Sequence, residues 1–168
     1  MLSAVADAGP LIHLAEIDQL SLLRIFDAFW IPSAVWAETV DAGRLDELLL
    51  AKLGNYYRHQ SVAAEVDTWI AQNQLSALHW GERESLYLCQ LLKINVLLTD
   101  DLAVREAAQR LQIQPVGSLG IVARACQSGI LSLNEAEFLM RALQHTSSLF
   151  VTPAIIELAV KQLRLRMA

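Results

Sequence analysis

The chain has 168 residues, enough for one domain with a sizeable buried core, and its 54% hydrophobic and 18% charged residues exclude a disordered protein. The net charge of −5 is opposite in sign to that of most nucleic-acid-binding proteins, unless the acids are concentrated around bound cations. No stretch approaches 18 uninterrupted apolar residues and no basic segment opens the chain, so we expect neither a membrane span nor a signal peptide.

Apolar strands alternate with helical patterns along the first half of the chain. Residues 2–6 form an apolar run that ends at Asp7, which places this carboxylate at the C-terminal end of a predicted strand. Residues 29–31 predict a second strand, and Ser33 is expected to cap the helix that carries Glu38. The helical patterns of this half, of which the fourth is expected to be peripheral, cover residues 11–17, 20–26, 35–40, 44–57 and 63–71.

The second half continues the alternation. Residues 95–99 predict an apolar strand that ends directly at the Asp100–Asp101 pair, and residues 114–116 predict one more short strand. Helices are expected over residues 79–92, 104–111, 119–126, 134–145 and 153–165. Such alternation, with strands that are continuous apolar runs, predicts a parallel sheet covered by helices on both faces. No linker or repeat divides the chain, so we expect one domain.

Each of the candidate acids has an ordinary structural explanation when taken alone. Asp7 can cap the following helix, Glu38 can lie on a solvated helix face, and Glu82 stands at a helix start where the macrodipole favours acids. One residue of the Asp100–Asp101 pair can cap a helix, but a cap needs only one. As a set they are more informative, because ligands of open α/β sheets bind at the carboxyl ends of the strands.

Acids crowded at this edge would repel one another by roughly 4 kcal/mol per pair at about 4 Å, so a cation is expected among them. Oxygen ligands without a histidine or cysteine cluster favour Mg²⁺ or Mn²⁺. Divalent ions held by carboxylates activate water and stabilise charge on a phosphate. The expected chemistry is therefore phosphodiester hydrolysis.

The remaining reactive side chains are assigned structural roles. The histidines at positions 13, 59, 79 and 145 are scattered and are expected to pair with nothing. Cys89 and Cys126 lie in apolar helical patterns without metal-ligand spacing, which predicts buried reduced thiols and hence a cytoplasmic protein. The four tryptophans are expected to pack in the core or a dimer interface rather than to stack on bases.

Five segments give the acids a specific context, and their order resembles that of PIN-domain nucleases: VADAGPLIHL, IPSAVWAE, HWGERESLYLCQ, VLLTDDLAVREAA and PVGSLGIVARACQSGIL. The chain is most similar to VapC-like bacterial toxins of the DUF3368-type subgroup. In that subgroup the third acid appears as Gly-Glu and the fourth lies in an Asp-Asp pair before an arginine. The resemblance covers roughly residues 3–160.

This resemblance implies a three-layer α/β/α sandwich with a mainly parallel central sheet. It implies one PIN-like domain over residues 1–168, in which residues 130–168 form a C-terminal helical extension packed on the rest. The implied activity is cleavage of single-stranded RNA that depends on Mg²⁺ or Mn²⁺. Homodimerisation and inhibition by a cognate antitoxin, as in a type II toxin–antitoxin pair, are also implied.

Carried over by position, the four catalytic and metal-binding acids of the family match Asp7, Glu38, Glu82 and Asp101. Asp100 occupies the variable place of a Thr-x-Asp pattern and is a further candidate metal ligand. Thr99 either supports a ligand through its hydroxyl or simply ends the strand. Arg105 either forms an intrahelical ion pair with Asp101 or contacts a substrate phosphate.

Other uses of acids at strand ends fit the sequence less well. Receiver domains need an acidic pair after the first strand and a late lysine, and haloacid-type phosphatases need Asp-x-Asp after the first strand. This chain has Asp7-Ala8-Gly9 at that place and no corresponding lysine. A non-catalytic PIN-like interaction domain that acts through dimer or partner binding stays as the alternative. Its acidic charge and high apolar content suit such a role.

Overall fold

The computed structural model describes residues 1–168 and contains one five-stranded sheet in which every strand pair is parallel. The strand order across the sheet is β3-β2-β1-β4-β5. The strands are short: β1 (Ser3–Ala6), β2 (Ala28–Pro32), β3 (Tyr56–His59), β4 (Val96–Leu98) and β5 (Gln114–Val116). The predicted mainly parallel sheet is confirmed.

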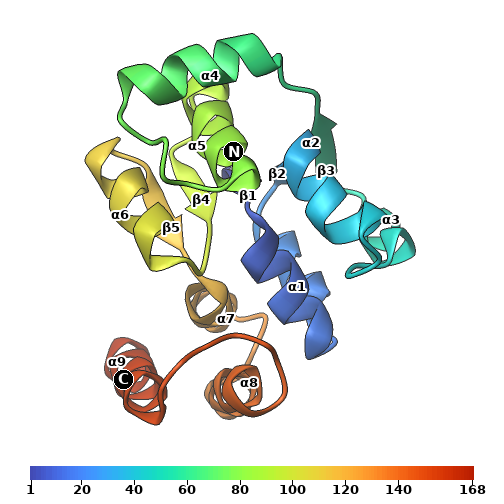
Figure 1. Ribbon diagram of the computed structural model, residues 1–168. Helices are drawn as coiled ribbons and strands as arrows, with labels where there is room; N and C mark the ends of the chain where they lie inside the picture. The colour runs from blue at the N-terminus through green and yellow to red at the C-terminus, as the bar shows by residue number, and fades with distance from the viewer.

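Helices cover both faces of the sheet, which gives three layers (Figure 1). On one face, Val5 and Leu97 pack against α4 (Ala63–Gln72), α5 (Trp80–Leu92) and α6 (Leu102–Arg110). On the other face, β1 and β4 contact α1 (Ala8–Glu16), the 3-10 helix η1 (Leu20–Ile25) and α7 (Ser118–Gln127). The predicted three-layer α/β/α sandwich is confirmed.

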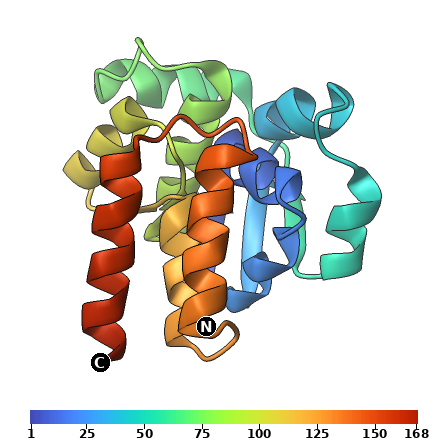
Figure 2. The same cartoon turned by 90° about the horizontal axis from the view of Figure 1, so that it is seen from below.

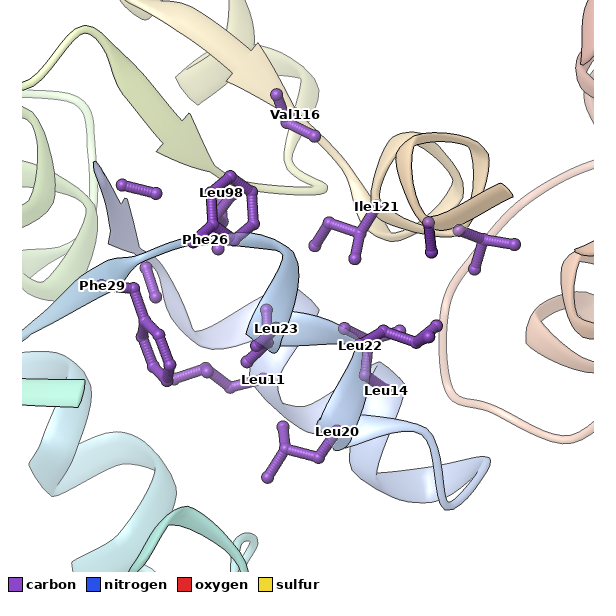
Figure 3. Packing of buried hydrophobic residues seen from close by; sticks show 14 of the residues in the cluster. Leu11, Leu14, Leu20, Leu22, Leu23, Phe26, Phe29, Leu98, Val116 and Ile121 are labelled. Atoms are coloured by element: carbon purple, nitrogen blue, oxygen red, sulfur yellow. The ribbon is translucent and has the colours of Figure 1, made fainter. Parts of the chain in front are cut away.

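The larger core lies between the sheet and the layer of α1, η1 and α7. Figure 3 shows side chains from these elements converging. Five of them are fully buried: Leu11, Leu23, Phe29, Leu98 and Ile121. Complete burial of leucine- or phenylalanine-sized side chains contributes about 1.5–3 kcal/mol each. This core fixes the end of β1 against that of β4.

The last two helices, α8 (Leu133–His145) and α9 (Pro153–Met167), pack on α7 and on each other (Figure 2). Exposed ion pairs join them, Arg141 with Glu157 and Arg164 with Glu137. The segment between the helices reaches back to α1, where the backbone N–H and the hydroxyl of Ser148 both donate to Glu16, over 2.8 and 2.6 Å. This contact holds the connecting segment beside the carboxyl edge of the sheet.

Two local predictions were wrong, and a third segment forms a different type of helix. The segment predicted as helical over residues 44–57 contains a short helix, α3 (Glu47–Leu53), and then β3, an edge strand whose half-exposed polar residues give no apolar run. The helical pattern over 20–26 is the 3-10 helix η1, a form common in short connections. Ser33 does not cap α2 (Ser33–Trp36), because it lies in the first turn of that helix and Glu84 accepts from Ala34 N instead.

No helix in the structure combines the length and the apolar character needed to cross a bilayer. Cys89 and Cys126 are both buried and free, as predicted.

Candidate active site

The site lies where the order of strands in the sheet changes direction. From β1 the chain passes to β2 and β3 on one side, and later to β4 and β5 on the other. The carboxyl ends of β1 and β4 are neighbours, and Asp7 N donates to Leu98 O over 2.9 Å. A crevice opens at such a switch point, because the connections leave the sheet on opposite sides.

A cleft of about 840 Å³ occupies this position. Its lining includes all five acids named from the sequence: Asp7, Glu38, Glu82, Asp100 and Asp101. The chain thus brings together residues from β1, the π-helical turn η2 (Ala37–Asp41), the first turn of α5 and the end of β4.

Asp7 lies deepest and is only 6% exposed. Its Oδ1 accepts from Ala8 N over 2.8 Å, which caps α1, and its Oδ2 accepts from the Thr99 hydroxyl over 3.0 Å. Burial raises the pKa of this carboxyl to about 7, further raised by Glu82 and Glu38 and only partly offset by the two hydrogen bonds. Asp7 therefore combines the capping and cleft-facing roles, and a nearby cation would favour its ionised form.

Glu38 reaches the cleft from η2, which continues directly from α2 as a wider, π-helical turn. Its Oε1 accepts from Gly81 N over 3.3 Å. A Cβ at residue 81 would lie 2.7 Å from that same oxygen, so only glycine leaves room for the carboxylate there. Such π-helical turns are frequent at functional sites.

Glu82 is the third residue of α5, and its Oε2 accepts from His79 N over 2.8 Å. This bond fixes the side chain at the helix start. Burial is the main cause that raises the pKa of Glu82, and the charges of Asp101 and Glu38 raise it further. Its neighbour Glu84 points elsewhere and is buried against the start of α2, so only one acid of this pair faces the cleft.

The two residues of the Asp100–Asp101 pair have different surroundings. Asp101 is exposed, and its Oδ1 caps α6 by accepting from Val104 N over 3.0 Å. Asp100 accepts from Nδ1 of His13 over 2.7 Å, and from the backbone N and hydroxyl of Ser118 over 2.7 and 2.6 Å. Asp100 thus joins α1 to the start of α7, and the prediction that the histidines pair with nothing was wrong for His13.

Thr99 and Arg105 support this edge. The Thr99 hydroxyl is fully buried, donates to Asp7 and accepts from Asp101 N over 3.3 Å, so one side chain links both acids. Arg105 does not pair with Asp101; its Nη1 donates to the Thr99 carbonyl over 3.1 Å. The intrahelical ion pair considered from the sequence is therefore absent, and the guanidinium is held at the end of β4.

The donor set suits a hard divalent cation. The five cleft-lining acids offer carboxylate oxygens, and the charges of Asp7, Glu38 and Glu82 act on one another. No three histidine, cysteine or acidic side chains are close enough to hold an ion as a ready-made cage. Mg²⁺ does not require such a cage, because it usually keeps several waters and binds through one or two carboxylates.

The rim of the cleft contains residues that sequence reasoning missed: Arg44, His79, Trp80, Ser148, Leu149 and Phe150. Trp80 is 39% exposed and Phe150 is 95% exposed. Most of them come from connecting segments, which carry no periodic signal. One sequence signal could have pointed to this part of the site. Gly81 stands in the first turn of a helix, a position for which glycine has a poor helix propensity.

Comparison with known proteins agrees with this architecture. The DUF3368 family, described as a PIN domain, matches residues 3–164. No curated protein and no solved structure gave a significant match to the chain. The family match spans the sheet, the acidic cleft and both C-terminal helices, so the chain belongs to the PIN-domain family, whose fold is of nuclease type.

Proposed function

We propose that the protein is a metal-dependent endoribonuclease that hydrolyses phosphodiester bonds of single-stranded RNA. The observation that carries this proposal is Asp7, a buried carboxylate at the strand switch point whose pKa is raised to about 7 and which shares one cleft with Glu38 and Glu82. Burial and mutual repulsion disfavour the ionised carboxylates, so their charges lower the stability of the folded protein unless a cation binds there. Membership of a nuclease-type fold family favours a catalytic use of that cation.

In this proposal Asp7, Glu38, Glu82 and Asp101 hold Mg²⁺ or Mn²⁺, one or two of them directly and the others through the ion's bound waters. The bound ion would lower the pKa of a water molecule and stabilise negative charge on the phosphate. The protein's part is to hold the ligands in place: Thr99 orients Asp7, the Gly81 N–H orients Glu38, and the His79 N–H orients Glu82. Asp100, a weaker ligand candidate, has both oxygens engaged by His13 and Ser118, which suits a role in positioning α1 and α7.

The proposed biological role is that of the toxin in a type II toxin–antitoxin pair in the cytoplasm, acting as a homodimer and inhibited by a cognate antitoxin. Large apolar side chains lie exposed on several elements, and they support the idea that partners cover part of the surface: Leu102, Phe138, Phe150 and Leu165. The same exposure would suit the alternative, a non-catalytic PIN-like interaction domain. Catalysis separates the two.

The test uses purified protein and a labelled single-stranded RNA, with Mg²⁺ or Mn²⁺ and with EDTA. We expect cleavage with either ion and none with EDTA. Glu82→Gln should lower the rate by more than the roughly 10–100-fold loss typical of changes beside a metal site. Glu135→Gln is the matched control, because Glu135 holds the equivalent capping position of α8 and lies outside the cleft.

The Glu135 variant should retain the wild-type rate. Equal cleavage by the Glu82→Gln and wild-type proteins, once contaminating nucleases are excluded by a mock purification, would refute the proposed site. Absence of cleavage by the wild-type protein on all RNAs tried, with both ions, would favour the interaction domain.

A further inference from the structure

A second groove, of about 950 Å³, adjoins the acidic cleft. It lies between α7 and α9, with the end of β5 and the start of α6 beside it. Figure 2 shows α9 alongside the helices before it, with the α8–α9 connection crossing over at one end. The groove and the cleft share Asp100, Leu149 and Phe150, so the groove is continuous with the candidate active site.

The groove is positively charged in a protein whose net charge is −5. Three helices each contribute one arginine to it: Arg105 from α6, Arg124 from α7 and Arg166 from α9. None of the three forms an ion pair, whereas Arg141 and Arg164 between α8 and α9 are both paired with glutamates. The only acid of the groove is Asp100, whose oxygens accept from His13 and Ser118. Unpaired guanidinium groups along one groove indicate an anionic occupant.

The rest of the lining is apolar or uncharged, which restricts the class of anion. Leu119, Gly120 and Ala123 form an apolar and small-residue wall along α7. Phe150 is 95% exposed at the junction of the groove and the cleft, although burying such a ring would be favourable. Arginines beside apolar surface and an exposed aromatic ring are the features with which proteins hold single-stranded nucleic acid, because phosphates bind the cations and bases stack on the rings.

We propose that this groove carries the stretch of the single-stranded RNA substrate that flanks the cleavage site, with phosphates on Arg105, Arg124 and Arg166 and a base stacked on Phe150. The inference rests on the proposed nuclease function and names the path of its substrate. It also explains how a protein with a net negative charge binds RNA, because three arginines lie together in the groove beside the cleft. An apolar protein partner in the groove would leave three guanidinium groups without carboxylates, at a high desolvation cost.

The test is binding of a fluorescently labelled 12-nucleotide oligouridylate to the full-length protein in EDTA, which withholds the metal and leaves the strand intact. Anisotropy gives the dissociation constant over a series of salt concentrations. The variants are Arg124→Gln/Arg166→Gln, the triple variant that adds Arg105→Gln, and Phe150→Ala. The double variant retains Arg105, because its hydrogen bond to Thr99 O connects α6 to the end of β4. Arg164→Gln is the matched control, since it makes the same charge change on α9 at a residue paired with Glu137.

Each phosphate contact on a single strand adds about 0.7 to the slope of log affinity against log salt, so the slope should fall by about 1.4 in the double variant and about 2 in the triple variant. Phe150→Ala should weaken binding about fivefold or more at an unchanged slope. The Arg164 control should match the wild-type protein, and thermal unfolding monitors folding of every variant.

Wild-type affinity and slope in the double and triple variants would overturn the proposal, as would failure of the wild-type protein to bind the strand. A change of oligomeric state in the triple variant by light scattering would also overturn it, because the groove would then be an interface between copies of the chain. Binding and cleavage are measured separately, so Mg²⁺-dependent cleavage with no effect of the groove variants would remove this inference alone. Groove-dependent binding without any cleavage would overturn the proposed function and reduce the groove to a binding surface for single-stranded RNA.

Discussion

Replacing Asp7 with asparagine should stabilise the metal-free protein at alkaline pH and have much less effect at acidic pH. Burial raises the pKa of Asp7 in the folded protein to about 7 from its ordinary value of 3.8. Between these values the unfolded chain has lost this proton and the folded protein still holds it, so stability falls as pH rises from about 4 to about 7. Above pH 7 or so, the folded protein carries the full cost of a buried carboxylate.

A pKa difference of about 3 units corresponds to about 4 kcal/mol at 1.36 kcal/mol per unit, and at pH 5 only about 1.6 kcal/mol of this cost has developed. Asparagine carries no charge at either pH and still accepts from Ala8 N, while its interaction with Thr99 changes by about 1 kcal/mol at both pH values. The gain in stability from Asp7→Asn should therefore be about 2–3 kcal/mol larger at pH 8 than at pH 5.

Urea unfolding in EDTA, followed by tryptophan fluorescence, measures this difference. The control is Asp46→Asn at the exposed start of α3, where the side chain caps the helix through Leu48 N. Because Asp46 is in contact with water in the folded and unfolded chain alike, its stability difference should be the same at both pH values. An Asp7→Asn difference that does not change between pH 5 and pH 8 would refute the idea that the buried acid calls for a cation.

The remaining predictions address the metal ion, Gly81 and the Asp100–Asp101 pair. Saturating Mg²⁺ or Mn²⁺ should raise the free energy of unfolding of the wild-type protein, by about 2.7 kcal/mol at an ion concentration of 100 times Kd. It should hardly change the free energy of unfolding of the Asp7→Asn variant. Equal gains in the two proteins would place the ion elsewhere. Gly81→Ala should abolish RNA cleavage, because the added Cβ displaces the Glu38 carboxylate. The thermal stability should stay equal or rise, because alanine has a better helix propensity than glycine. Full activity would show that Glu38 needs no fixed position. In urea, Asp100→Ala should cost about 2–4 kcal/mol through the loss of its part-buried hydrogen bonds to His13 and Ser118. Asp101→Ala should cost about 1 kcal/mol through the lost helix cap. Equal costs would contradict the positioning role of Asp100.

The central sheet was largely predictable because three of its strands are mostly apolar. Buried parallel strands require continuous hydrophobic runs, and β1, β2 and β4 provide them. The short strand β5 was predicted at Gln114–Val116, before the break at Gly117. The strand β3 was missed because it contains no apolar run and exposes Tyr57 and Arg58. Its position depends on pairing with β2, a tertiary contact that local pattern does not encode. The capping of α2 by Glu84 was missed for the same reason, since the two elements are 50 residues apart.

The positions of the acids were predictable, and their different surroundings were not. A carboxylate that follows an apolar strand must lie at its end, so Asp7 and Asp101 were expected in one crevice. The side-chain partners of Asp100 are His13 and Ser118, which lie 87 and 18 residues away along the chain. The sequence could not supply these partners. Nor could it show that the connection between α8 and α9 places Phe150 on the rim of the cleft.

The pairing of β1 with β4 has a consequence for when the cleft comes into existence during synthesis. Asp7 is translated well before its hydrogen-bond partner Thr99, which follows 92 residues later. At about 5–20 residues per second the ribosome needs roughly 5–20 s to add that length, and more to release it from the exit tunnel. Until then β1 has no β4 beside it and the acids are far apart. A nascent chain that still lacks β4 therefore has no acidic cleft, and the site is complete only once the second half of the sheet has been added.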